Sequence, residues 1–219
     1  MLKKEYKNMI LILMTIVYQT FIYLIAKVSP FTNHLLVSNL DLKIPFVSYF
    51  IYFYISWYIM LILVPYVMGK KDSDVLYKYV TSMIIAITIS GLIFIFYPTT
   101  ITRPEIIGNT FSDIIISIIY AIDTPATNCL PSIHCLCCFL FILGITEAKN
   151  VKWFSKTVII IWSLLVIIST LFIKQHVLID ILASFILAIL TYLFVNKSKI
   201  WKKIKIKWAN FSSFYFNPK

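Results

Sequence analysis

A histidine and an aspartate stand four residues apart in a stretch that is otherwise almost entirely apolar. His176 and Asp180 end the stretch 169–180, and ionisable side chains this close to hydrocarbon are costly, which by default indicates a function. On a helix, this spacing places both side chains on one face, where Asp180 accepts a hydrogen bond from one imidazole nitrogen. The other nitrogen is then free as a nucleophile or base. A polar pair at a capped helix start is the alternative interpretation.

A second polar group, formed by Pro131, Ser132 and His134, begins another apolar run. Proline is well accommodated in the first turn of a helix, where the backbone amides lack intrahelical partners and bind anions. With a serine hydroxyl and an imidazole beside it, such a helix start can hold a phosphoryl group and donate a proton. The third polar group is Arg103-Pro104, which contains the only arginine of the chain. Its guanidinium is a planar fork of donors suited to phosphate oxygens.

The elements that position these groups are predicted to be membrane-spanning helices. The 219 residues are 60% hydrophobic and only 13% charged, with a mean hydropathy of +0.89, which is typical of an integral membrane protein. The chain is therefore predicted to be one all-α membrane domain, 1–219. Six spans of the length that a bilayer requires are expected at about 9–26, 46–68, 79–97, 131–146, 154–173 and 177–196. The first is interpreted as a retained anchor, not a cleaved signal peptide.

The distribution of lysines predicts the orientation of these spans. Most of them lie in the N-terminal segment, in the connections 69–78 and 147–156, and in the tail 197–219. By the positive-inside rule, both termini are cytoplasmic, and all three polar groups then fall at the outer ends of spans three, four and six. The net charge of +11 is explained in this way, so nucleic acid is not expected as a partner. The basic tail is expected to rest on the anionic inner leaflet or to act as a topological signal.

Two loop regions and a cysteine cluster complete the pattern. Residues 114–120 are apolar but too short to span, so we expect a short interfacial or re-entrant helix between spans three and four. The loop 27–45 contains His34 and Asp41 without an interpretable motif, and Asp123 has no assigned role. The spacing of Cys129, Cys135, Cys137 and Cys138 does not match a zinc site, so we predict no metal and expect these cysteines to pack as small apolar residues.

Taken together, the three polar groups resemble the motifs of the type 2 phosphatidic acid phosphatase superfamily. Its pattern is Lys-x6-Arg-Pro, Pro-Ser-x-His and Ser-Arg-x5-His-x3-Asp. Arg103-Pro104 resembles the end of the first motif, 131–134 the second, and Ser169 with His176 and Asp180 the third. The resemblance covers about 79–196 and implies a six-span bundle with its site at the outer face.

Three positions depart from that pattern. The lysine of the first motif would fall at Phe96 and the arginine of the third motif at Thr170, so two expected cations are missing. Lys174 follows Thr170 by four residues and, if this segment is helical, brings an ammonium to the same side. Ile133 replaces the usual glycine, so that its amide still donates but its side chain narrows the site. These departures make the chain more similar to the divergent branch that includes inositol-phosphoceramide synthase-like phosphotransferases.

The resemblance implies a role for each residue. His176 attacks phosphorus, Asp180 holds the ring of His176, and His134 exchanges the proton with the leaving and entering oxygens. Arg103, Ser132, Lys174 and Ile133 bind the phosphate oxygens, and neither metal nor cofactor takes part. The implied substrate is a lipid phosphate or diphosphate at the outer face of the cell membrane. Hydrolysis or transfer, the lipid itself and the oligomeric state are left open, as are the alternatives of a transporter or an inactive membrane scaffold.

Overall fold

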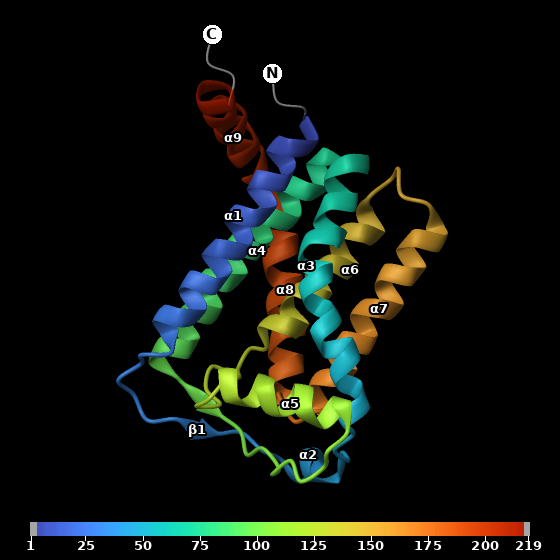
Figure 1. Ribbon diagram of the computed structural model, residues 1–219. Helices are drawn as coiled ribbons and strands as arrows, with labels where there is room; N and C mark the ends of the chain where they lie inside the picture. The colour runs from blue at the N-terminus through green and yellow to red at the C-terminus, as the bar shows by residue number, and fades with distance from the viewer. Residues whose placement is uncertain (1–3, 217–219) are drawn as a thin grey trace.

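The computed structural model describes residues 4–216, and these form an all-α bundle (Figure 1). Lys3 and Lys219, which belong to the lysine pattern above, lie outside the described residues. The helices are α1 (Lys4–Ala26), α2 (Asn39–Lys43), η1 (Ser48–Phe50), α3 (Ile51–Lys71), α4 (Ser73–Phe96), α5 (Phe111–Ile122), α6 (Ile133–Glu147), α7 (Trp153–Phe172), α8 (Leu178–Ser198) and α9 (Trp201–Phe216). The all-α class predicted from the sequence is confirmed.

Five of the described helical segments are long and apolar enough to cross a membrane: α1, η1 with α3, α4, α7 and α8. The remaining predicted span, the fourth at 131–146, corresponds to α6, which is a helix of only 15 residues. At 1.5 Å per residue this is about 22 Å, shorter than the roughly 30 Å of a hydrocarbon core. α6 is packed against α4, α7 and α8 in the centre of the bundle. The structure therefore supports five spans by length, and the count of six stays a prediction.

The core of the bundle is built around α4 and α6. Tyr79 of α4 stacks on Phe141 of α6 with ring centroids 5.6 Å apart. Cys135, Cys137 and Cys138 are fully buried in this core, the environment expected of small apolar side chains. Gly91 lets α1 approach α4 closely, since a Cβ there would lie 2.4 Å from a side-chain carbon of Ile22. Small residues at helix interfaces are the usual means of close packing between membrane helices.

The two ends of the bundle differ in what they carry. α9 and the beginning of α1 lie at one end, and α2, α5 and the short strands lie at the other (Figure 1). The predicted basic tail is a helix, α9, that packs against α4 with Trp201 and Trp208 buried. Lys205 of this helix forms an ion pair with Asp74 at an N–O distance of 2.6 Å. Its predicted contact with the inner leaflet remains a prediction.

At the opposite end, two loops are tied together beside the candidate site. Strands β1 (His34–Leu35) and β2 (Thr99–Thr100) pair in parallel, with His34 opposite Thr99. This pairing holds the loop 27–45, which we call the first outer loop after its predicted orientation, against the residues that precede Arg103. The loop that earlier offered no motif is thus part of the scaffold of the site.

The short helix expected between spans three and four is α5, which lies across this end of the bundle (Figure 1). Thr110 and Asp113 form a capping box that begins the helix. Near its C-terminus, the Tyr120 hydroxyl donates to the Ile173 carbonyl at 2.6 Å. Burial raises the pKa of Tyr120 to about 12, so the hydroxyl stays protonated and keeps this bond at neutral pH. α5 is thereby attached to the turn that carries His176.

Candidate active site

The predicted pairing of His176 with Asp180 is present. His176 Nδ1 lies 3.2 Å from Asp180 Oδ2, and the aspartate side chain is fully buried. The helical geometry proposed for this pair is wrong, because α7 ends at Phe172 and α8 begins only at Leu178. His176 belongs to the connection between them, while Asp180 is in the first turn of α8. The two side chains meet because the connection folds back over the start of the helix.

Backbone geometry explains this turn. Lys174 adopts a left-handed conformation with φ of 50°, and the amides of Gln175 and His176 both donate to the Thr170 carbonyl, at 2.9 and 3.2 Å. Such a residue ends a helix, because the chain leaves the helical direction there. The Val177 amide then donates to Asp180 Oδ2 at 3.0 Å. One carboxylate oxygen therefore caps α8 and orients the imidazole ring.

His134 lies in the first turn of α6, next to His176. The centroids of the two imidazole rings are 5.9 Å apart. The His134 ring packs against Tyr54 at 4.5 Å and Trp57 at 4.2 Å, both from α3. Its Nε2 atom is buried and has no hydrogen-bond partner within residues 4–216. A buried polar atom without a hydrogen-bond partner calls for an explanation. A ligand that forms a hydrogen bond with Nε2 is one such explanation.

Arg103 is held in place by polar groups on two sides. Its Nη2 atom donates to Asp123 Oδ2 at 2.6 Å and to Gln175 Oε1 at 2.5 Å, and Nη1 donates to the Asp123 carbonyl at 3.1 Å. The guanidinium also lies 4.7 Å from the ring centre of Tyr120. Since Gln175 immediately precedes His176, these bonds fix Arg103 relative to the turn of the candidate nucleophile.

The remaining predicted residues take different positions. Lys174 is not on a helix, so the helical argument for it fails, and its ammonium donates to the carbonyls of Asp41 at 3.0 Å and Ile44 at 2.5 Å. Ser132 is the N-cap of α6, fully buried, and its hydroxyl accepts from the Cys135 amide at 3.3 Å. Pro131 therefore precedes the cap and is not in the first helical turn. Ile133 is the first helical residue and borders the cavity that contains His134.

Two cavities reach this cluster, and His176 lines both. One of about 310 Å³ is bordered by Arg103, Lys174 and His176 together with residues of the first outer loop. The other, of about 340 Å³, is bordered by His134, Gln175 and His176 and by the apolar faces of α1, α3 and α5. The structure thus gathers Arg103, Lys174, Ile133, His134 and His176 around two adjoining spaces. Ser132 and Asp180 lie behind them as supports.

Sequence reasoning missed several residues that shape this site. Asp41 borders the first cavity, Gln175 supports Arg103, and Tyr54 and Trp57 enclose His134. Both aromatic residues belong to the predicted second span and are buried inside the bundle. Asp123 is the acidic partner of Arg103, a role that no local pattern indicates because twenty residues separate them. Among these missed residues, only Gln175 could have been suspected from the sequence, because it directly precedes His176.

Comparison with known proteins identifies the family of the chain. No curated protein and no solved structure matches the chain significantly. A family model for the PAP2 superfamily matches residues 24–194, which extends the resemblance beyond 79–196 to include the end of α1 and the whole first outer loop. The match covers most of the chain and all three polar groups. The chain therefore belongs to the PAP2 superfamily, the type 2 phosphatidic acid phosphatases.

Proposed function

We propose that this protein is a membrane phosphatase or phosphotransferase that acts on a lipid phosphate through a phosphohistidine at His176. Membership of the PAP2 superfamily supports a phosphatase-type enzyme. The observation that carries the specific proposal is the pairing of His176 Nδ1 with the buried Asp180 carboxylate at 3.2 Å. This bond assigns the proton to Nδ1 and leaves the Nε2 lone pair available for attack.

In the first half-reaction, His176 Nε2 forms a bond to phosphorus as the bond from phosphorus to the lipid oxygen breaks. The imidazole gains positive charge, which the Asp180 carboxylate stabilises. His134, with its ring centre 5.9 Å from that of His176, donates a proton to the departing oxygen. The lipid leaves as an alcohol or, from a diphosphate, as a monophosphate.

In the second half-reaction, neutral His134 takes a proton from water or from an acceptor alcohol. That oxygen attacks phosphorus, the N–P bond breaks, and His176 is restored. Hydrolysis and transfer share the phosphohistidine and differ only in the second nucleophile. Because the chain is proposed to be similar to inositol-phosphoceramide synthase-like enzymes, an alcohol acceptor should be tested as well as water.

Charge that develops on the phosphate oxygens is stabilised by groups around the two cavities. We assign Arg103 and Lys174 to this role, because both border the cavity that His176 also lines. Ile133 and Ser132 contribute through the start of α6, whose first-turn amides carry a partial positive charge. In this proposal, Ser132 acts mainly as the cap that sets the direction of those amides.

The cavity beside His134 supports a substrate that arrives from the bilayer. Leu24 of α1, Tyr58 of α3 and Ile122 of α5 border it together with the two histidines, so one space joins apolar walls to the candidate chemistry. A lipid tail and its phosphate need such a combination. With the lysine-rich end of the bundle in the cytoplasm, the site lies at the outer face of the cell membrane.

The test is turnover by the purified protein in detergent with phosphatidate, phosphatidylglycerophosphate and a polyprenyl diphosphate, each with and without an alcohol acceptor. Brief reaction with ³²P-labelled substrate and rapid denaturation at alkaline pH should trap a phosphoprotein that is acid-labile, as a phosphohistidine is. His176→Ala should abolish both turnover and trapping. An active protein whose label survives in His176→Ala would overturn the assignment, and a folded protein that turns over none of these substrates would overturn the proposed function.

A further inference from the structure

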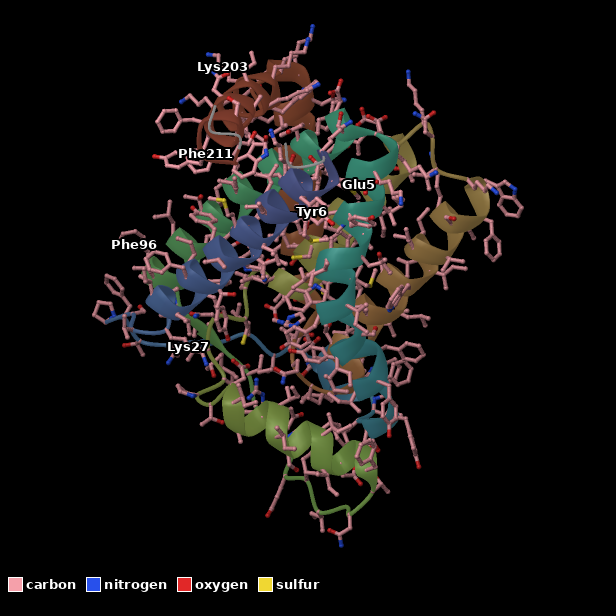
Figure 2. All side chains as sticks on the ribbon, turned by 45° about the horizontal axis from the view of Figure 1, so that its top comes forward. Glu5, Tyr6, Lys27, Phe96, Lys203 and Phe211 are labelled. Carbon is pink, nitrogen blue, oxygen red and sulfur yellow. The ribbon has the colours of Figure 1, made fainter. Side chains whose placement is uncertain are left out.

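A lysine outside all three polar groups reaches the candidate site. Lys27 follows the last residue of α1, and its ammonium lies 3.3 Å from Asp123 Oδ1 with about a fifth of the side chain exposed. It borders the same cavity as His134 and His176. Figure 2 shows Lys27 at the end of α1 on the side of α5. An ammonium therefore faces the space in which both histidines lie.

The charges around Asp123 show what this lysine contributes. Oδ2 of this carboxylate accepts from Arg103. Oδ1 faces the ammonium of Lys27 and also accepts a hydrogen bond from the Tyr23 hydroxyl at 2.5 Å. Arg103 and Asp123 alone form a neutral pair, which attracts a phosphate dianion weakly. Lys27 gives the trio a net charge of +1. The ammonium of Lys174 borders the other cavity and donates to two carbonyl oxygens there.

We propose that Lys27 is a phosphate-binding residue that supplies a further cation, beside those assigned above, on the side of the cavity that contains His134. The inference rests on the proposed function and extends it to a residue in another part of the chain. The first-motif lysine would fall at Phe96, which has no charge to offer a phosphate. Phe96 is 65% exposed and packs against Phe31 with ring centroids 6.1 Å apart. Figure 2 shows Phe96 at the periphery of the bundle. The cation comes from the end of α1 instead.

Inorganic phosphate is the probe, because its binding is measured without turnover. Its apparent Kd follows from the phosphate-dependent rise in the unfolding midpoint of the purified protein. Lys27→Gln removes the charge but keeps a donor for Asp123, and we expect phosphate binding to weaken about tenfold, as for the loss of one partly buried charge. Lys27→Arg should stay within about threefold of wild type, since it keeps the charge. Lys43→Gln is the matched control, because Lys43 is an exposed lysine at the same end of the bundle.

A second pair of variants separates direct binding from mere positioning of Asp123. In an Asp123→Asn background, Lys27 no longer has a carboxylate to hold. If Lys27 binds phosphate itself, Lys27→Gln should still weaken binding about tenfold there. If the effect of Lys27→Gln vanishes in this background, or if it equals that of Lys43→Gln in the wild-type background, the inference is overturned.

The two proposals fail in different ways. Should the protein bind phosphate in a Lys27-dependent manner and turn over no lipid phosphate, the proposed function fails and the binding role of Lys27 stands. Should it turn over lipid phosphate with phosphate binding unchanged in Lys27→Gln, the role of Lys27 fails alone. Should Lys27→Gln not fold, the comparison of Lys27→Arg with Lys27→Met decides, with retained binding expected only in the arginine variant.

Discussion

The side chain of Asp41 caps α8, the helix that contains Asp180: Asp41 Oδ1 accepts a hydrogen bond from the amide of Leu178, the first residue of this helix, at 2.8 Å. Its other oxygen accepts from the Ser38 amide at 2.8 Å, and its carbonyl accepts from Lys174. One residue of the first outer loop thus contacts both sides of the turn that presents His176. We conclude that this loop positions the proposed nucleophile.

Asp41→Ala should therefore lower both stability and turnover. Loss of a capping carboxylate typically costs about 0.5–2 kcal/mol in the free energy of unfolding. Turnover should fall by a larger factor than the unfolded fraction explains, because the turn at His176 loses its support. Thermal unfolding and lipid-phosphate turnover of the same preparation measure both effects. Lys43→Ala, in the same short helix, is the control, and equal behaviour of the two variants would refute the capping role.

The same carboxylate predicts a dependence of stability on pH. Burial by itself would raise the pKa of Asp41, but hydrogen bonds from Ser38 and from the Leu178 amide outweigh it and hold the pKa below its usual value. A lowered folded-state pKa contributes stability above the unfolded value of about 3.9, and this contribution is lost as the pH falls through the folded-state pKa. The difference in unfolding midpoint between wild type and Asp41→Asn should thus be full at pH 7 and shrink on acidification below pH 4. A difference that stays constant with pH would contradict this assignment.

His134→Ala should yield a folded protein with greatly reduced activity. Positioned general acid–base groups contribute about 10²–10⁴ in rate, so turnover should fall by a factor in that range. The natural control is His34→Ala, because His34 stacks on Tyr97 in an exposed loop, with ring centroids 4.2 Å apart. The expectation is wrong if both alanine variants reduce turnover equally.

Arg103→Lys should be nearly as damaging as loss of the side chain. The guanidinium joins the Asp123 carboxylate, the Asp123 carbonyl and Gln175 through two nitrogens, and one ammonium cannot reproduce that fork. We expect turnover to fall by about tenfold or more, the effect of losing a charge-assisted bidentate contact. Initial rates and size-exclusion profiles of wild type and variant would be compared. Wild-type rates in Arg103→Lys would show that only the positive charge matters.

Lys174→Ala should cut activity strongly, as expected of a cation beside the phosphate. The structure adds a second consequence, because the ammonium holds the carbonyls of Asp41 and Ile44 in the first outer loop. Turnover and the unfolding midpoint should both decrease. Near-normal turnover with a lowered midpoint would assign Lys174 to loop anchoring alone, with Lys43→Ala again as the surface control.

The polar groups could be recognised from the sequence because each interrupts hydrocarbon-like surroundings. His176, Asp180, Ser132, His134 and Arg103 stand at the ends of long apolar runs, where desolvation makes unpaired polar groups expensive. Apolar run length likewise predicted the helices and the short α5. Apolar run length and its interruptions are local properties of the chain, so they can be predicted from neighbouring residues alone.

Tertiary structure alone determined which residues contact and position those polar groups. Asp41 and Leu178 are 137 positions apart, and Lys27 meets Asp123 across nearly a hundred residues. The turn at Lys174 also replaced the helix that the spacing of His176 and Asp180 had indicated. Local sequence determined which residues can do chemistry. The packing of helix ends and loops determined which charges lie beside them, because electrostatic partners are selected by distance in space and not by distance along the chain.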